Sequence, residues 1–539
     1  MQRRGLIQFG AFQLNLETCE LRHGRRAVKL SPKPSRVLAI LAASPGRLIS
    51  REVIYKELWD AGTHVDFEHG LNFCIREIRK ALGDKAAKPH YIETLARRGY
   101  RFVAECRTVT ADSGPETERA VAPQSEQVEA SRCEAPRYEA WRHYENARKS
   151  FGQAGKESLE SAREQFELAL AMLPDYALAH SGLGATYALR SLNRRHPDDL
   201  DKAELHLSRA LELDGEIAEP YPWLCYVHLR RNRPEAAFEA GHRGVRLQPD
   251  LVTAHYFLGL AYFVGAEMDA SRYQCAAAHL LNAARVNPQW QATWFVLSYV
   301  ALSTGDYAYA ERYANTLLDM SGAAPGVPFV GAEIVLGTVK LRRGDAVGAR
   351  GVVHAFLDRM ADSHHMYRDA MTAAAACVLG DVELRHGDAA AAQAAYRRGW
   401  HTLQENPRVA AHQRIAARAQ AGLAAAYAAA GDHTRALGLL ERASDTAIAS
   451  ESLEHSAAAA SMPEVYWTIA TAWSRIGDSE RVLAALRSAI RTGWRDAAWL
   501  ERDPEFAAFR NLSGFRQLLE EVRHWRSVIE FEGATAPSP

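Results

Sequence analysis

The sequence predicts a mainly α protein in two parts, a small α+β domain at the N-terminus and a long all-α solenoid behind it. Residues 1–107 carry short alternating apolar runs and then amphipathic helical patterns. From Pro136 to Glu530 the chain is rich in Ala and Leu, with helical periodicity and a recurring pattern of small residues. At 539 residues, the chain is long enough for such an array.

The first domain begins with a stretch typical of strands. The segment LIQFGAFQLNLETCELRHGRRAVKL, from Leu6 to Leu30, has short alternating apolar runs. These runs are broken at turn-forming residues, including Gly10 and Gly24. We therefore expect a small antiparallel meander at this end of the chain.

Three helices should follow the meander. Ser31 is a suitable N-cap for the first helix, which should stop near Ser44 in the sequence SPG. Ser50 is a suitable cap for the second helix, REVIYKELW. The third helix contains GLNFCIREIRKALGD, from Gly70 to Asp84. After it, YIETLARRGYRFV predicts two short strands joined as a hairpin.

This order of helix, helix, loop, helix and hairpin is that of a winged helix-turn-helix. The segments SPGRLISREVIYKELW, IREIRKALGD and YIETLARRGYRF resemble the OmpR/PhoB-type DNA-binding domain, and the resemblance covers Leu6–Val103. It implies a transcription regulator that binds double-stranded DNA at promoter sites. It also implies that the third helix is the recognition helix.

The third helix has two distinct faces. At about 100° per residue, one apolar stripe should pack on the earlier helices, and it consists of Leu71, Ile75, Ile78 and Leu82. A second face would then be free to enter the major groove, and it consists of His69, Asn72, Phe73, Arg76, Arg79 and Lys80.

The residue types on the second face suggest their roles. The Asn72 carboxamide can pair with adenine, and the Arg76 guanidinium can pair with guanine. Phe73 can contact a thymine methyl group or belong to the core, whereas Arg79 and Lys80 are expected to contact phosphates. Asn72 stands where the family commonly has an acidic residue, and His69 where it often has Arg. The target sequence therefore cannot be carried over from the family.

The hairpin adds a second candidate contact. Arg97 and Arg98 flank its tip, where an arginine can insert into a narrowed minor groove. The wing arginine of the family aligns with Ala96, so Arg97 or Arg98 would have to replace it.

Weaker candidates lie elsewhere in the domain. Arg51 and Lys33 stand near the expected starts of helices and are candidate phosphate contacts. The segment Asp60–Glu68 corresponds to the part of the family domain that can contact RNA polymerase, which is therefore a candidate partner.

A linker and a repeat region follow the domain. Thr108–Ala135 lacks aromatic residues and is rich in Glu, Ser, Ala and Pro, which predicts a flexible linker. Residues 531–539 should form a disordered tail. Between them, small or apolar residues recur at offsets 0, 4 and 7, as in Ala162, Phe166 and Ala169. An LG motif recurs upstream, and Gly-Asp pairs recur 39 to 46 residues apart, at residues 305, 344, 387, 431 and 477.

This pattern resembles the tetratricopeptide repeat, in which two antiparallel helices pack closely. Small residues allow the close packing, and a glycine can take the positive-φ position between the helices. The resemblance covers roughly Pro136–Val522 and implies a groove that binds a protein, a peptide or a small ligand.

Composition and charge restrict the function classes. Residues 1–107 contain 20 Lys and Arg against 11 Asp and Glu, whereas the rest of the chain has 45 against 54, so a basic domain precedes an acidic body. No apolar run approaches a membrane span, and the seven scattered cysteines have no metal-ligand spacing. We expect a cytoplasmic protein that is not an enzyme and has no cofactor, catalytic residues or metal ligands.

We interpret the chain as a sequence-specific DNA-binding regulator with a tetratricopeptide-like arm. The alternative is an interaction scaffold whose winged helix contacts protein instead of DNA. A homodimer is a further candidate assembly, because two copies on repeated half-sites would gain effective concentration.

Overall fold

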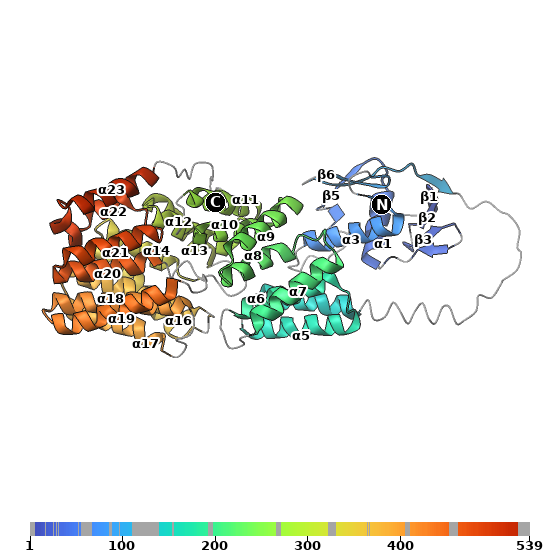
Figure 1. Ribbon diagram of the computed structural model, residues 1–539. Coiled ribbons are helices and arrows are strands. Elements are labelled where there is room, and N and C mark those ends of the chain that lie inside the picture. The colour runs from blue at the N-terminus through green and yellow to red at the C-terminus, as the bar shows by residue number, and fades with distance from the viewer. Residues whose placement is uncertain are drawn as a thin grey trace, which may run out of the picture. The chain divides into compact units, whose positions relative to one another are not determined.

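The computed structural model in Figure 1 divides the chain into two compact units, Met1–Tyr138 and Glu139–Pro539, and each is described by itself. The described residues are 6–16, 18–24, 26–28, 30, 32–51, 53–54, 67–85, 89–95, 98–109, 139–153, 156–191, 198–265, 271–321, 330–363, 365, 367–404, 410–451 and 462–526. Most of the predicted linker and all of the predicted tail lie outside these ranges.

The first unit contains two antiparallel sheets. A five-stranded sheet has the order β4-β3-β2-β1-β8, and its strands are β1 (Leu6–Phe9), β2 (Phe12–Asn15), β3 (Leu21–His23), β4 (Arg26–Val28) and β8 (Arg107–Val109). The predicted meander is therefore confirmed. Strand β8 pairs with β1 and extends the domain two residues into the predicted linker.

A second sheet carries the predicted hairpin. Its order is β5-β7-β6, with β5 (Leu48–Ser50), β6 (Ile92–Leu95) and β7 (Gly99–Phe102). Strand β5 was not expected from the sequence. It pairs with β7, and a Cβ atom on Gly99 would lie 2.1 Å from the carbonyl oxygen of Ile49. Gly99 also has φ +142°, so both the backbone angle and the close approach require glycine there.

Two helices in this unit are described along their whole length, α1 (Pro32–Ala42) and α3 (Phe67–Leu82). Of the expected second helix, Arg51, Val53 and Ile54 are helical, and the amide of Val53 donates to the Ser50 hydroxyl at 3.4 Å. The remainder of that helix lies outside the described residues. Helices α1 and α3 pack together over the sheets, with Phe9 against Phe102 at 4.9 Å between ring centroids.

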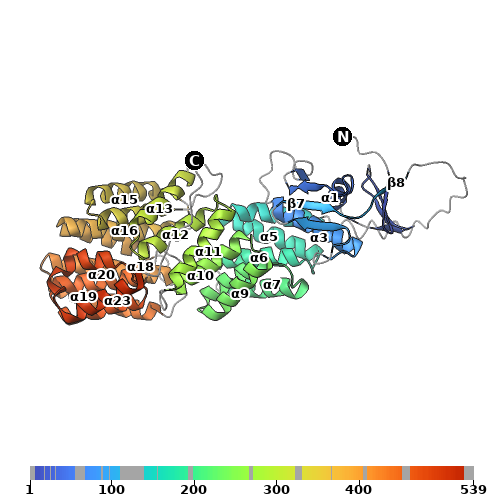
Figure 2. The same ribbon diagram turned by 90° about the horizontal axis from the view of Figure 1, so that it is seen from above.

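The second unit is a run of helix pairs (Figures 1 and 2). The pairs are 139–152 with α5 (Lys156–Met172), α6 (Ala177–Arg190) with α7 (Asp199–Leu213), α8 (Pro220–Arg230) with α9 (Pro234–Leu247), α10 (Val252–Gly265) with α11 (Arg272–Val286), α12 (Gln291–Ser303) with α13 (Tyr307–Ser321), α14 (Ala332–Arg342) with α15 (Ala346–Ala361), α16 (Arg368–His386) with α17 (Ala389–Thr402), α18 (Ala410–Ala429) with α19 (His433–Glu451), and α20 (Met462–Ile476) with α21 (Ser479–Arg491).

The LG motif is explained by contacts within these pairs. A Cβ atom on Gly184 of α6 would lie 2.6 Å from Leu207 of α7, and one on Gly380 of α16 would lie 2.6 Å from the ring of Tyr396 in α17. The glycine therefore admits a large side chain from the second helix of the pair. The first helices of successive pairs from α6 onward also contact one another and form an inner layer.

The Gly-Asp pairs form the turns within the later repeats. The glycines at 305, 344, 387, 431 and 477 have φ between 77° and 89°. The side chain of the aspartate that follows accepts a hydrogen bond from the backbone amide three residues later. Asp345, for example, accepts one from Gly348 at 2.8 Å. Each Gly-Asp dipeptide thus ends one helix with a left-handed glycine and starts the next helix with an aspartate N-cap. This confirms the expected role of the glycine.

The chain then crosses the ends of the inner helices with α22 (Ala497–Arg502) and a 3-10 helix (Pro504–Phe509), before α23 (Ser513–Arg526). Trp494 stacks on Trp467 of α20, with 3.9 Å between the ring centroids. Three arginines at the C-terminal ends of inner helices bind carboxylates of this crossing segment: Arg342 with Asp496, Arg385 with Asp503, and Arg475 with Glu505. The segment therefore closes the C-terminal repeats through charged contacts.

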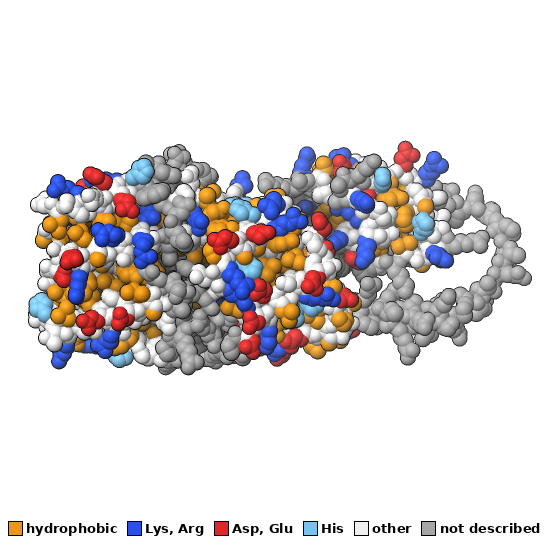
Figure 3. All heavy atoms as spheres, viewed as in Figure 1, with side chains coloured by type: hydrophobic (Ala, Val, Ile, Leu, Met, Phe, Trp, Pro, Cys, Tyr) orange, Lys and Arg blue, Asp and Glu red, His pale blue; other side chains and the backbone are white. Residues whose placement is uncertain are grey.

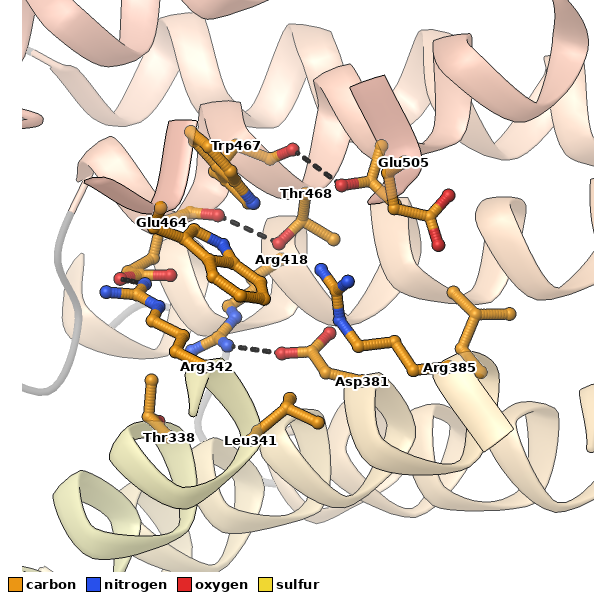
Figure 4. A pocket seen from close by; sticks show the side chains of 13 residues that line it. Thr338, Leu341, Arg342, Asp381, Arg385, Arg418, Glu464, Trp467, Thr468 and Glu505 are labelled. Atoms are coloured by element: carbon orange, nitrogen blue, oxygen red, sulfur yellow. Dashed lines mark hydrogen bonds and ion pairs between the residues drawn. The ribbon is translucent and has the colours of Figure 1, made fainter. Parts of the chain in front are cut away.

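A small cavity of about 40 Å³ lies beside this closure (Figure 4). Arg342, Arg385 and Arg418 line it together with Asp381 and Glu464. Arg418 donates to Asp381 at 2.7 Å, and Arg342 donates to Glu464 at 2.6 Å. Because the cationic side chains have carboxylate partners, opposite charges are balanced around the cavity.

Candidate nucleic-acid interface

The apolar stripe of α3 lies in the core, as predicted. Leu71, Ile75, Ile78 and Leu82 are all buried and join the cluster that contains Leu38 of α1. This packing orients α3, because a helix with one buried stripe must present its remaining residues elsewhere.

The polar residues of α3 are described in part. Lys80 is exposed, whereas Arg76 and Arg79 are half-buried. The backbone at His69, Asn72 and Phe73 is helical, and their side chains lie outside the described residues. The structure therefore places these candidates on one helix, with three basic side chains in its last two turns.

The wing hairpin follows α3 directly. Arg98 is exposed in the turn between β6 and β7, and its amide donates to the carbonyl oxygen of Leu95 at 3.0 Å. Arg97 lies outside the described residues. Across the two strands, Arg101 forms an ion pair with Glu93 at 3.2 Å, so this arginine of the hairpin is neutralised within the domain.

The third candidate region is the start of the second helix. Arg51 is half-buried and its guanidinium lies over the ring of Tyr100, 5.3 Å from the centroid. This cation–π contact links the first residue of the helix to strand β7. The side chain of Lys33 lies outside the described residues.

Arg79 reaches the wing. Its Nη2 atom donates to the carbonyl oxygen of Ile92 at 2.9 Å and to the Thr94 hydroxyl at 2.8 Å. Burial lowers the pKa of Arg79, and the nearby charge of Asp84 opposes that shift.

Asp84 is a residue whose role was missed by sequence reasoning. This buried carboxylate accepts backbone amides from Lys85, His90, Tyr91 and Ile92, at 3.1, 2.7, 3.3 and 2.9 Å. The only available signal was an aspartate directly after Gly83, at the end of a helix and shortly before a strand.

The described residues contain no group of three or more His, Cys, Asp and Glu side chains arranged to hold a metal ion. None of the described helices is both long enough and apolar enough to cross a membrane.

Comparison with known proteins bears on the N-terminal domain. Residues 24–102 match the family described as "Transcriptional regulatory protein, C terminal". The chain is 34% identical over 94 residues to the cholera toxin transcriptional activator of Vibrio cholerae, a match that covers 17% of this chain and 32% of that protein. It is 33% identical over 95 residues to the phosphate regulon transcriptional regulatory protein PhoB of Rhizobium meliloti, covering 18% and 41%.

These matches span well under half the length of either relative. Among solved structures, the chain is similar to PilW, a type IV pilus biogenesis factor, with a TM-score of 0.33 and 16% identity over 42% of this chain and 94% of that one. The family match identifies the N-terminal domain as one of the OmpR/PhoB type, as predicted. The contacts within and between the helix pairs behind it are those of the predicted tetratricopeptide-like solenoid.

Proposed function

We propose that the chain is a transcriptional regulator whose OmpR/PhoB-type winged helix binds duplex DNA in the cytoplasm. The observation that carries this proposal is the geometry of α3. Its apolar stripe is fully used in the core, and Arg76, Arg79 and Lys80 follow one another along its last two turns, next to the hairpin. A helix of this kind fits the width of the major groove.

We assign roles on α3 by chemistry. Asn72 and Arg76 contact base edges, because a carboxamide suits adenine and a guanidinium suits guanine. Phe73 contacts a thymine methyl group, His69 lies at the start of the contact surface, and Lys80 supplies positive charge to a phosphate. The Arg79 guanidinium is bound to Ile92 and Thr94 of β6 instead.

The wing and the second helix complete the interface. Arg98, exposed at the hairpin turn, enters the minor groove together with Arg97. Arg51 contacts a phosphate near the start of the second helix, while its stack on Tyr100 fixes its orientation.

The test uses the full chain and a library of duplexes. We expect selection of one preferred site, and we expect Arg76→Ala to weaken binding to that site and to relax base choice at one position. Arg26→Ala, a change in the edge strand β4 of the other sheet, is the matched control and should leave binding unchanged. A wild-type chain that prefers no duplex would contradict the proposal.

We also propose that the repeats bind a protein or peptide partner. The cavity of about 40 Å³ has room for little more than ordered water, so this cavity does not itself hold a small effector. On the face drawn in Figure 3, acidic, basic and hydrophobic side chains are mixed over the repeats. Candidate partners include RNA polymerase, through Asp60–Glu68, and a second copy of the chain.

The rival proposal is a scaffold whose winged helix contacts protein. It predicts that Arg76→Ala weakens the capture of a protein partner by the winged helix and that no duplex competes for this binding. Competition by the preferred duplex would decide against it.

A further inference from the structure

The turn between α3 and the wing is fixed by one carboxylate. Asp84 is buried, with four backbone amides around it, and three of these belong to the residues that lead into β6, namely His90, Tyr91 and Ile92. A carboxylate that accepts several amides is held in one position and in turn holds the backbone that donates them.

Arg79 holds the same strand through a second set of atoms. Asp84 accepts the amide of Ile92, and Arg79 donates to the carbonyl oxygen of Ile92 and to the hydroxyl of Thr94. Strand β6 lies at the edge of the sheet β5-β7-β6, so these groups would otherwise be unpaired there. Arg79 in the last turn of α3 and Asp84 directly after the helix therefore bind both polar backbone groups of Ile92.

We propose that Arg79 and Asp84 are positioning residues that fix the wing on the recognition helix, and that Arg79 acts through the wing instead of through a phosphate. This inference rests on the proposed DNA-binding function. Arg76 lies one helical turn before Arg79, and the exposed Arg98 lies four residues after Thr94. We call Arg79 and Asp84, with the groups of β6 that they bind, the clamp. The clamp sets the distance between the major-groove contact of Arg76 and the minor-groove contact of Arg98.

The first experiment requires no DNA. Hydrogen exchange is measured on the full chain with Thr94→Val, Arg79→Gln and the matched control Lys80→Gln, which removes a neighbouring charge. We expect the first two to accelerate exchange of the β6 amides about tenfold while the α1 amides keep their protection, and Lys80→Gln to change neither. Unchanged β6 exchange in both clamp variants would overturn the clamp, whatever the chain binds.

The second experiment uses the preferred duplex and Asp84→Asn. Removal of a negative charge should by itself strengthen binding to DNA. The clamp predicts the opposite, a loss of about tenfold, because the wing is no longer held where Arg98 can reach the minor groove. Tighter binding by Asp84→Asn would contradict a positioning role.

The third experiment is a double-mutant cycle between Arg79→Gln and the pair Arg97→Ala and Arg98→Ala. If Arg79 acts through the wing, Arg79→Gln should change the affinity for the preferred duplex little in a chain that lacks the wing arginines. The loss of affinity in the combined variant should then be close to the larger of the two separate losses. If Arg79 contacts a phosphate directly, the two losses multiply and the positioning role fails. A wild type that prefers no duplex while the exchange result holds would contradict the proposed function and leave the clamp as a purely structural device.

Discussion

Arg385 donates two hydrogen bonds, of 2.8 and 2.9 Å, to the carboxylate of Asp503, which lies 118 residues further along the chain and is fully buried. The guanidinium also lies over the ring of Trp499, 4.8 Å from its centroid. A planar guanidinium suits both contacts, because it matches a carboxylate with two parallel donors and stacks on an aromatic face. This pair joins the end of α16 to the segment that crosses the C-terminal repeats.

Arg385→Met should therefore destabilise the repeats strongly. The change leaves the Asp503 carboxylate buried without its bidentate partner, and the loss of one member of a buried pair costs about 3–5 kcal/mol. We expect this decrease in the free energy of unfolding, measured by urea denaturation of the full chain. The exposed pair Arg209 and Asp175 is the control, since Arg209→Met should change the free energy of unfolding far less than Arg385→Met does. Equal effects of the two changes would contradict the role of the closure.

The N-terminal repeats contain two equivalent histidine pairs. The Nδ1 atoms of His180 and His206 are 2.9 Å apart, and those of His255 and His279 are 3.1 Å apart. In each pair the first histidine has Nε2 at 2.9 or 3.0 Å from a proline carbonyl oxygen, at residues 174 and 249. A carbonyl oxygen only accepts, so this Nε2 carries a proton. Burial lowers the pKa of all four histidines, so the rings are neutral near pH 7, and a neutral ring with its proton on Nε2 accepts at Nδ1. The pairs are therefore built from neutral imidazoles.

Acid should consequently weaken these repeats. Burial, together with the neighbouring histidine, lowers the pKa of His206 and of His279 to about 4. The unfolded chain then binds protons before the folded chain does, so stability is complete above about pH 6.5 and is lost as the pH falls toward 4. After allowance for solvent screening, we expect a loss of about 1 kcal/mol for each of the two between pH 7 and pH 5, measured by urea denaturation.

The control for this prediction keeps a donor and removes the titration. In the variant His206→Gln with His279→Gln, an amide N–H can still reach the partner Nδ1 atom. The nearby charges of Glu167 and Lys202 remain in place around position 206. The variant should lose less stability than the wild type between pH 7 and pH 5. An unchanged pH dependence would show that other groups cause the acid sensitivity.

Local features of the fold were predictable from the sequence, and distant pairings were not. The stripe of Leu71, Ile75 and Ile78 follows from periodicity, and the Gly-Asp turns follow from cap chemistry, because both depend on residues a few positions apart. Strand β5 was missed because three residues carry no periodicity and its partner, β7, lies about fifty residues later.

The candidate site shows the same division. Residue types on α3 indicated which side chains could contact DNA, and the hairpin was located by its alternating residues. Nothing in the sequence indicated that Arg79 donates a hydrogen bond to Thr94, or that Asp84 accepts hydrogen bonds from the backbone amides at the start of β6. Such contacts depend on how the turn after α3 is placed in three dimensions, which composition and spacing do not specify.

Two glycines around one ring give a test of the repeat packing. Cβ atoms on Gly380 and Gly422 would lie 2.6 and 2.2 Å from the ring of the buried Tyr396. Gly422→Ala should lower the free energy of unfolding by about 1–3 kcal/mol, because the ring must shift within a packed core. Gly438 lies in α19 with open space around it. Gly438→Ala should therefore raise the free energy of unfolding by about 0.5–1 kcal/mol, because alanine has the higher helix propensity. Thermal unfolding of the two variants should therefore shift in opposite directions.

Salt dependence should separate the two proposed kinds of DNA contact. Each phosphate contact releases counterions, so Lys80→Gln should reduce the slope of log affinity against log salt by about 1 and weaken all duplexes alike. Arg76→Ala should weaken the preferred duplex by roughly 1–3 kcal/mol and random duplexes much less, since it removes a base contact. Both are measured by fluorescence anisotropy on the full chain from low to high salt. Equal losses on preferred and random duplexes for Arg76→Ala would reassign Arg76 to the phosphate backbone and leave Asn72 as the base contact on α3.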